Sequence, residues 1–395
     1  MDLDAVKQRM AEEVDRRAEL LLDVSHRIHA NPELNFEEEA AHDLLCEALE
    51  AEGIDTERHA HGLDTAFVGR AGADGPHVAV CLEYDALPGI GHACGHNIIA
   101  AAGLGAGLAA AALADACGGR VSIVGTPAEE GGGGKVLQVA AGAFEGVDAA
   151  MMVHPAGADL RSMDTIAIHR CLVTFHGECA HAAAAPEKAR NALDAAVLSY
   201  VNVAALRQHI GSAERVHGVF TDGGDKPNII PDRAQMEWYV RSPTVASLQV
   251  LKGRFAACME AGAAAAGCEV ELDWLEPPYA DMVEVDVLLE RYAENAGALG
   301  RNVLDPKDVG GVVGSTDMGN VSYEVPSIHP MIQAAEPGTA IHTPAFADFA
   351  AGPLGDRAVL DGAKAMAWTI ADLWLQPGLL DAARDEHRRR LAERS

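Results

Sequence analysis

The sequence is poor in basic residues. It contains 30 lysines and arginines against 59 aspartates and glutamates, which gives a formal net charge of −29. A protein that binds a nucleic-acid backbone needs a positively charged face to meet the phosphates. The charge balance therefore excludes nucleic acid as the main partner and is typical of an acidic, well-hydrated surface.

The sequence also lacks a long hydrophobic run. The longest one, IIAAAGLGAGLAAAALA at 98–114, has 17 residues and consists mainly of Ala and Gly. It is too short and too weakly apolar for a membrane span, and we interpret it as a buried helix. The opening MDLDAVKQRMAEEVDRRAELL has no apolar segment after a basic start, so it does not resemble a signal peptide. We expect no membrane partner.

Paired cysteine motifs are absent as well. The eight cysteines include no Cys-x-x-Cys pair and follow no regular spacing. Such cysteines, in a chain that shows no leader, are typical of reduced thiols. The sequence therefore predicts a cytoplasmic protein.

Length and pattern predict two domains. A chain of 395 residues is too long for one ordinary core. Short apolar strands at 77–82 and 120–125 flank the Ala- and Gly-rich helix, which predicts a βαβ unit. The order then changes to β-α-β-β-α-β, which is typical of a small α+β module inserted into a larger domain. We expect one domain made of 1–166 and 278–395 and a second made of 167–277.

The ends of the chain add further elements to the larger domain. We expect one long amphipathic helix at about 4–28. After the insertion, the pattern predicts a helix at 285–298, strands at 309–313 and 327–332, and a helix at 356–375.

Four segments carry side chains that can bind metal, and each lies at the end of an apolar strand or in a nearby turn. They are EYDALPGIGHACGHN at 83–97, GTPAEEGGGGK at 125–135, MMVHP at 151–155 and IHTPAF at 341–346. In an open α/β sheet, such strand ends converge on one crevice. A thiolate, imidazoles and carboxylates together suit Zn, Mn, Co or Ni better than Ca or Mg.

Each segment has a simpler interpretation when taken alone. A single histidine is usually a surface or core residue, Cys94 alone could be a small buried hydrophobe, and a Glu-Glu pair is usually solvated. The metal interpretation depends on all four segments together. The adjacent Glu129 and Glu130 strengthen it, because one carboxylate can bind metal while its neighbour holds the proton of an activated water.

The motifs resemble those of the aminoacylase/carboxypeptidase G family of metallopeptidases. The similar stretches are DALPGIGHACGHN, GTPAEEGGGGK, MMVHP, GECAHAAAAP, NIIPD, STDMGNVSYEVPSIHP and HTPAF, in order from about residue 20 to 370. They are most similar to the amidohydrolase branch, on the side of its β-alanyl-lysine dipeptidase-like and aminobenzoyl-glutamate hydrolase members. The resemblance implies an α/β fold, namely a two-metal catalytic domain with a mixed sheet between helices and an inserted α+β ferredoxin-like lid and dimerisation domain.

The resemblance also implies which residues hold the metals. Two divalent ions, Zn or Mn with Co or Ni as alternatives, would be bound by five ligands. These would be Cys94, His96, Glu130, His154 and His342. Glu129 would be the general base, and Asp85 would be a supporting carboxylate that orients a ligand.

Three residues of the inserted domain are implied to contact substrate. His181 would polarise the scissile carbonyl, reaching the active site of a partner subunit in a homodimer. Asn228 and Arg241 would hold the substrate's carbonyl and carboxylate. One departure from the family pattern is Asn97, where many members carry Asp, and we interpret it as a marker of specificity.

These roles imply a metal-dependent amidohydrolase or dipeptidase. It would hydrolyse the amide bond of small N-acyl amino acids or dipeptide-like substrates with a free carboxylate. An aminobenzoyl-glutamate-type carboxypeptidase is the alternative. A non-catalytic binding protein would have degraded ligand positions, whereas all are filled here. A structural metal site would not need a base such as Glu129 beside a ligand.

Overall fold

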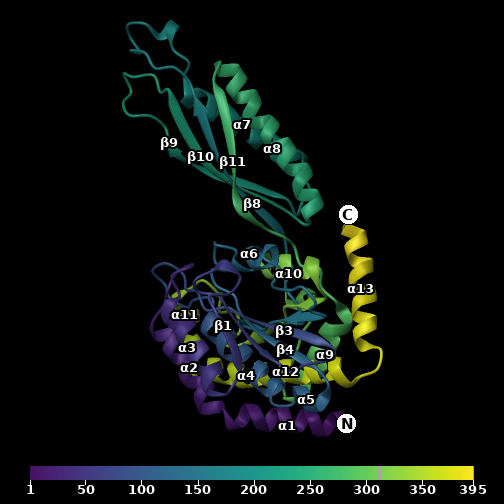
Figure 1. Cartoon of the computed structure of the whole chain (residues 1–395). Coiled ribbons are helices and arrows are strands. Elements are labelled where there is room, and N and C mark those ends of the chain that lie inside the picture. Colours follow the sequence, from purple (N-terminus) through teal and green to yellow (C-terminus); the bar gives the residue numbers. More distant parts are fainter. Residues whose placement is uncertain (310–312, 395) are drawn as a thin grey trace. The chain divides into compact units, whose positions relative to one another are not determined.

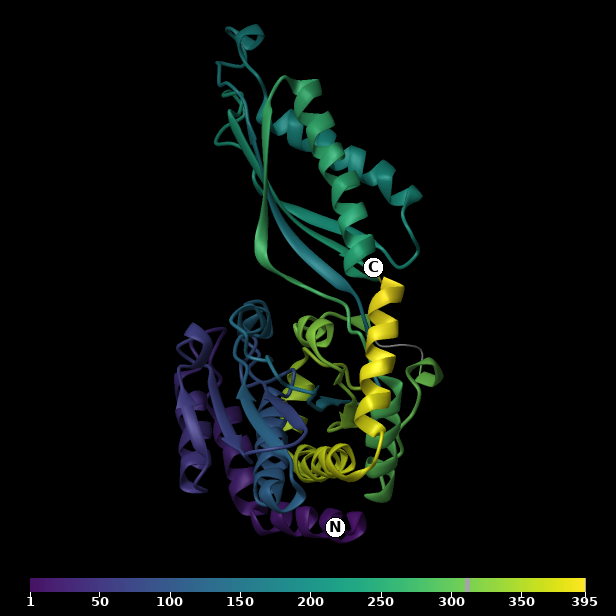
Figure 2. The same ribbon diagram turned by 45° about the vertical axis from the view of Figure 1, so that its right-hand side comes forward.

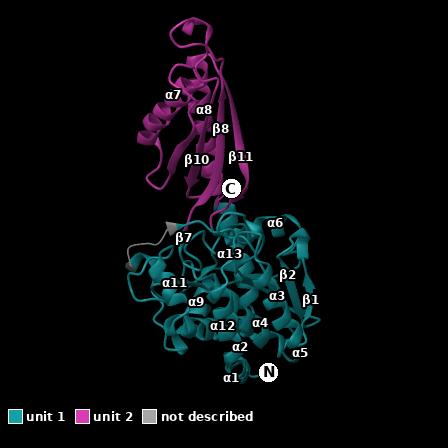
Figure 3. Cartoon of the chain, turned by 90° about the vertical axis from the view of Figure 1, so that its left-hand side faces the viewer, with its two compact units in different colours: residues 1–164, 282–393 teal, residues 165–281, 394–395 magenta. Residues whose placement is uncertain are grey.

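The computed structural model describes residues 1–309 and 313–394. The chain divides into two compact units (Figure 1). Unit 1 consists of Met1–Asp164 and Met282–Glu393, and unit 2 consists of Thr165–Asp281 together with the C-terminal Arg394 (Figure 3). Each unit has its own hydrophobic core.

Unit 1 is built on a mixed six-stranded sheet, as the resemblance implied. The strand order is β1-β2-β4-β3-β5-β13. The pairs β1/β2 and β2/β4 are antiparallel, and the pairs β4/β3, β3/β5 and β5/β13 are parallel. The strands are β1 Asp55–Arg58, β2 Phe67–Ala71, β3 His77–Leu82, β4 Arg120–Gly125, β5 Ala149–Met151 and β13 Ser327–Ile328.

Helices lie on both faces of this sheet, as Figures 1 and 2 show from two sides. Along β3, alternate residues point to opposite faces: Val78, Val80 and Leu82 join one core cluster, whereas Ala79 and Cys81 join another. The longer helices of the unit are α1 Leu3–Arg16, α2 Ala18–Ala30, α3 Glu39–Ala51, α4 His96–Ala111, α9 Asp286–Ala298, α12 Pro353–Leu375 and α13 Leu379–Arg394. The shorter elements are α5 Ala114–Cys117, α6 Gly134–Ala140, β6 His154–Ala156, β7 Asp164–Thr165, β12 Val313–Gly314, α10 Met318–Glu324, β14 Met331–Gln333 and α11 Pro344–Ala350.

The Ala- and Gly-rich run forms the buried helix α4, as predicted. A helix without a polar face has to be surrounded by other elements. Its glycines let neighbours approach closely: a Cβ atom at Gly105 would lie 2.7 Å from Leu21 Cδ1 and 2.9 Å from Ala363 Cβ. Small residues therefore allow α2 and α12 to pack directly against α4.

The N-terminal segment differs from the prediction of one long helix. It forms α1 and α2, with a break at Arg17, where φ is −101° and ψ is 7°. The Arg17 side chain is buried, and its Nε donates to Glu52 Oε2 at 2.9 Å. The break is accompanied by this contact with a residue far along the chain. Of the strand predicted at 309–313, residues 310–312 lie outside the described part of the chain.

Unit 2 is a four-stranded antiparallel sheet with two helices. Its elements follow the order predicted for the insertion: β8 Ala167–His176, α7 Ala192–Leu206, β9 Arg215–Asp222, β10 Arg233–Ser242, α8 Val245–Ala266 and β11 Glu269–Tyr279. The strand order is β11-β8-β10-β9, so β9 is an edge strand. Along β10, every second residue from Ala234 to Val240 is buried and packs toward the core that α7 and α8 share.

Among the described residues, no helix combines the length and apolar character that crossing a membrane would require. All eight cysteines lie in the described part of the chain, and none of them forms a disulfide.

Candidate metal centre

The four segments singled out in the sequence meet at one edge of the unit 1 sheet. The neighbouring parallel strands β3, β4 and β5 end at Leu82, Gly125 and Met151, and the first three segments continue from them or run through them. The fourth segment joins them because the His342 N–H donates to the Ala93 carbonyl at 2.8 Å. The parallel arrangement therefore gathers all four segments at the carboxyl ends of the strands.

The five ligand-type side chains form two groups. The donor atoms of Cys94, His96 and His154 lie within 4.8 Å of one another, and so do those of Cys94, Glu130 and His342. Cys94 Sγ is 3.4 Å from His154 Nε2, and His342 Nε2 is 3.3 Å from Glu130 Oε1. Two ligands of one tetrahedral zinc ion lie about 3.3–3.6 Å apart. These separations suit two ions that share Cys94.

Asp85 contacts two of the candidate ligand residues. His96 Nδ1 lies 2.9 Å from Asp85 Oδ1, and the Glu130 N–H donates to Asp85 Oδ2 at 2.9 Å. If Nδ1 carries the proton, the lone pair of His96 Nε2 faces the centre. His96 Nε2 and Glu130 Oε1 are buried and make no hydrogen bond with any described residue. Such atoms are costly to bury without a partner, and a cation bound at each donor group would satisfy them.

The centre perturbs its own ionisable groups. Burial, followed by the charges of Glu83 and Glu130, raises the pKa of Glu129 well above its usual value. Burial opposes the charged form of His96, but Asp85 and the other nearby negative groups outweigh it and raise the pKa of His96 well above normal. Burial and the neighbouring His329 and His96 lower the pKa of His154, which keeps it in the neutral form that binds metal.

Sequence reasoning missed three residues beside the centre. Lys135 Nζ donates to Glu83 Oε1 at 2.6 Å and to Asp317 Oδ1 at 2.7 Å, and all three side chains are fully buried. Glu83 Oε2 lies 3.5 Å from His96 Nε2. The available signal was the position of Glu83, directly after β3 and two residues before Asp85.

Asn97 has a structural explanation. Its Nδ2 donates to Ser25 Oγ at 2.9 Å and to the Ala350 carbonyl at 3.0 Å. A carboxylate could not donate to the carbonyl, so Asp would leave that acceptor unsatisfied. The amide at position 97 therefore ties α4 to two neighbouring helices.

His181 and Asn228 lie on adjacent segments of unit 2. The Ala182 N–H donates to the Asn228 carbonyl at 3.0 Å. The Ala183 N–H donates to His181 Nδ1 at 3.2 Å, and the His181 side chain is exposed. Because Nδ1 accepts this bond, the neutral ring carries its proton on Nε2, where it can be donated.

Arg241 lies at the opposite end of the same sheet. In the register of β10 with β8, Arg233 pairs with His176 and Arg241 pairs with Ile168. Residues 177–181 and 228–232 adjoin the Arg233 end, where the Gly177 N–H donates to the Asp232 carbonyl. Arg241 is partly buried, its guanidinium lies 5.7 Å from the centre of the Tyr239 ring, and its Nε has no hydrogen-bond partner among the described residues.

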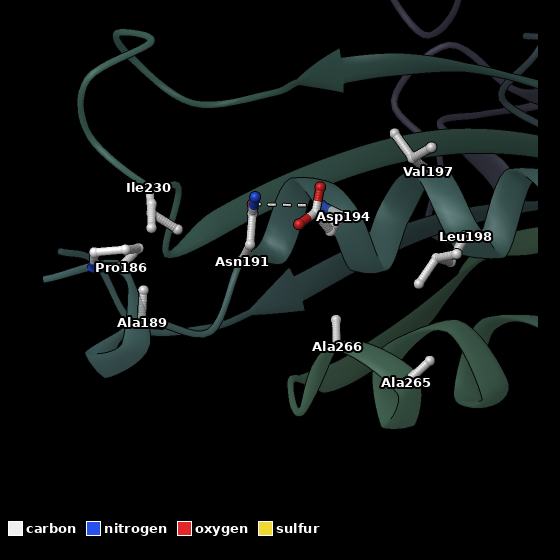
Figure 4. A pocket seen from close by; sticks show the side chains of 9 residues that line it. All are labelled: Pro186, Ala189, Asn191, Asp194, Val197, Leu198, Ile230, Ala265 and Ala266. Carbon is white, nitrogen blue, oxygen red and sulfur yellow. Dashed lines mark hydrogen bonds between the residues drawn. The ribbon is translucent and has the colours of Figure 1, made fainter. Parts of the chain in front are cut away.

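Unit 2 also contains a cavity of about 550 Å³ (Figure 4). It lies between the start of α7, the loop that precedes α7 and the end of α8. Pro186, Val197 and Ala266 are among its lining residues. The Asn191 side chain caps the start of α7, because it accepts hydrogen bonds from the N–H groups of Leu193 and Asp194. None of the predicted site residues lines this cavity, so we do not assign the substrate to it.

Comparison with known proteins identifies the relatives of this chain. The sequence profile of peptidase family M20/M25/M40 matches residues 82–367. Xaa-Arg dipeptidase of Mus musculus is 39% identical, over 99% of this chain and 94% of its own length. A p-aminobenzoyl-glutamate hydrolase subunit of Escherichia coli is 28% identical, over 92% of this chain and 91% of its own length.

Solved structures show the same fold. A dinuclear metal-binding peptidase of the M20 family from Bacillus subtilis matches with a TM-score of 0.70 and 21% identity, covering 91% of this chain and 99% of its own. An aminobenzoyl-glutamate utilization protein from Klebsiella pneumoniae matches with a TM-score of 0.72 and 19% identity. The match covers 95% of this chain and 100% of that chain.

Proposed function

Because the chain belongs to peptidase family M20/M25/M40 and is a metal-dependent hydrolase of peptide and amide bonds, we propose that it cleaves dipeptides and dipeptide-like N-acyl amino acids with a free carboxylate. The observation that carries this proposal is the pair of donor groups that share Cys94 beside the buried Glu129. The Xaa-Arg dipeptidases make dipeptides with a C-terminal arginine the first candidates.

In this proposal, Cys94, His96 and His154 hold one ion, and Cys94, Glu130 and His342 hold the other. The thiolate and imidazoles favour Zn or Mn, with Co or Ni as alternatives. When bound, the two ions supply Lewis acidity and make a water molecule acidic enough to lose a proton near neutral pH. Asp85 keeps His96 oriented toward the centre.

The chain's own residues handle the proton and the substrate. Glu129 accepts the proton of the attacking water and passes it to the leaving amine. His181 donates its Nε2 proton toward the carbonyl oxygen as negative charge develops there, and Asn228 holds the same group. Arg241 would bind the free carboxylate through two parallel hydrogen bonds, which suits a guanidinium whose Nε has no hydrogen-bond partner among the described residues.

We further propose that 167–277 act as a lid through which two chains dimerise. Arg233 and Arg241 are eight residues apart on β10, or roughly 26 Å along a strand. Two residues of an extended substrate span at most about 7 Å. One substrate cannot contact both ends of one lid, so His181 and Asn228 would serve the active site of a second copy.

The lid edge surface, defined by Val197 and Val201 on α7 and Val219 and Phe220 on β9, supports this dimer. Val219 is 63% exposed on an edge strand, and the other three side chains are also exposed. The rings of Tyr200 and Phe220 stack 5.8 Å apart, so Phe220 adjoins α7, whereas Val219 points to the other face of the sheet along the same exposed edge. An exposed apolar edge strand usually requires a partner that covers it.

Replacing both Val201 and Val219 with lysine should convert the dimer into a monomer, because four buried ammonium groups per dimer cannot be hydrated. Size-exclusion chromatography with light scattering measures the change. Val250→Lys, on α8 and 67% exposed, is the matched control and should remain dimeric. An unchanged dimer in the double variant would show that the lid edge surface is not the interface.

Mixing two inactive variants should restore activity. If His181 acts on the partner's site, a heterodimer of His181→Ala and Glu129→Gln chains contains one complete site. An equal mixture with free subunit exchange should then recover about a quarter of the wild-type rate. The measurement is the rate after exchange, with heterodimers counted from two different tags. Heterodimers without activity would place His181 at its own chain's site.

The proposed function is tested by removing metal and adding Zn or Mn back. The substrate panel contains dipeptides ending in arginine, β-alanyl dipeptides, N-acetyl amino acids and aminobenzoyl-glutamate. Hydrolysis of dipeptides only in the metal-loaded protein supports the proposal, and a preference for aminobenzoyl-glutamate supports the alternative. Metal binding without any turnover would favour a binding protein.

The eight unpaired thiols support a cytoplasmic location as part of the same proposal.

A further inference from the structure

A third group of donor atoms lies beside the two just described. The ligand atoms of Glu83, His96 and Glu129 all lie within 4.8 Å of one another, and the three side chains are buried. His96 Nε2 is 3.5 Å from Glu83 Oε2 and 3.8 Å from Glu129 Oε2. The same nitrogen therefore belongs to two donor groups. We name them the thiolate site (Cys94, His96 and His154) and the carboxylate site (Glu83, His96 and Glu129).

Glu83 is held through one carboxylate oxygen, and its other oxygen makes no hydrogen bond with any described residue. Lys135 Nζ donates to Glu83 Oε1, and Lys135 is itself fixed because its N–H and its Nζ both donate to Asp317, at 2.9 and 2.7 Å. Glu83 Oε2 is buried and makes no hydrogen bond with any described residue. A buried carboxylate oxygen is costly without a partner, so its direction toward His96 Nε2 points to a bound cation.

The charge around this site suits a divalent ion. With their carboxyl groups ionised, Glu83, Glu129 and Asp317 carry three negative charges, and Lys135 carries one positive charge. This buried excess of carboxyl groups is unfavourable unless protons or a cation offset the charge. One divalent cation between Glu83 and Glu129 would neutralise it.

We propose that the carboxylate site binds a hard divalent cation of the Mg²⁺ and Mn²⁺ class and competes with the thiolate site for His96. The inference rests on the proposed metal centre. An imidazole nitrogen has one lone pair, so His96 Nε2 binds one ion at a time. Carboxylate oxygens favour hard ions, whereas the thiolate and two imidazoles favour zinc.

This competition has a functional consequence. An ion in the carboxylate site binds Glu129, the side chain that the proposed reaction uses as its base. Mg²⁺ in this site therefore displaces zinc from His96 and inhibits hydrolysis, and excess zinc reverses the inhibition. The balance between the two ions would regulate the enzyme.

The test measures metal binding by the metal-free full chain. Mn²⁺ binding is followed by the electron paramagnetic resonance signal of the free ion, and Zn²⁺ binding by competition with a chelator. Glu83→Gln keeps an acceptor for Lys135 but removes the charge of Glu83 Oε2. It should weaken Mn²⁺ binding at one site about 10- to 100-fold and change Zn²⁺ affinity less than about threefold. Cys94→Ala should show the reverse order, with the larger loss for Zn²⁺.

Two controls keep the test decisive. Glu47→Gln changes an exposed carboxylate of unit 1 and should alter neither affinity. If Glu83→Gln does not fold, as judged by circular dichroism, Glu83→Asp withdraws the same oxygen and should give the same selective loss. Wild-type Mn²⁺ affinity in the folded variant, or an equal loss for both ions, would overturn the proposal. A wild-type protein that binds zinc but hydrolyses nothing would refute the proposed function instead, without changing the Mn²⁺ result.

Discussion

A Glu129→Gln variant is expected to lose about 10²- to 10⁴-fold in kcat while still binding two zinc ions. Glutamine has nearly the same shape as glutamate, but it cannot take a proton from the attacking water. Glu129 belongs to neither of the two donor groups that contain Cys94, so its replacement should not remove a zinc ligand. The measurement is steady-state kinetics of the zinc-loaded protein, with the metal content of the same sample determined by mass spectrometry.

The neighbouring residue provides the matched control. Glu130→Gln changes the same chemical group one position along the chain, but Glu130 Oε1 lies 3.3 Å from His342 Nε2, in a donor group. This variant should therefore lose one zinc ion as well as activity. If Glu129→Gln retained a near-wild-type rate, Glu129 would not be the base.

The second large effect is expected at Cys94. Its replacement with alanine should weaken the binding of both zinc ions and abolish hydrolysis. Its sulfur is common to two groups of donor atoms, whereas His154 and His342 each belong to one. Alanine fits the buried position, so the metal-free protein should still fold. Zinc content and chelator competition measure the loss, and absorption of the Co²⁺-substituted protein reports whether a sulfur–metal bond is present.

Single-ion variants test whether the sulfur is shared. His154→Ala and His342→Ala should each leave one zinc ion tightly bound, while Cys94→Ala should leave none. Retention of one tightly bound ion by Cys94→Ala would mean that Cys94 serves only one ion.

The sequence was most informative where local pattern alone determines structure. Continuous apolar runs placed β3 and β4 at 77–82 and 120–125, the bounds that the structure has. The run of small residues similarly predicted the buried helix α4. The break at Arg17 was not predictable, because the contact there is with Glu52, which is distant in sequence.

The same distinction applies to the candidate site. Cys94, His96 and Glu130 were candidates because each is a ligand-type residue in a turn or at a helix start near a strand, and their binding of metal stays a prediction. Only Glu83 of the network left a sequence signal, because Lys135 and Asp317 are 182 residues apart and meet only in the folded chain. The separation of His181 from Arg241 likewise depends on the register of β10 with β8.

The position of His96 as the first residue of α4 has a consequence for evolution and engineering. Gly105 lies nine residues further along this helix, about 13 Å away along its axis, where there is no room for a side chain. A larger residue at Gly105 would displace the helix whose first residue is the candidate ligand His96. Sequence drift along α4 is therefore restricted by volume throughout and by chemistry at its start.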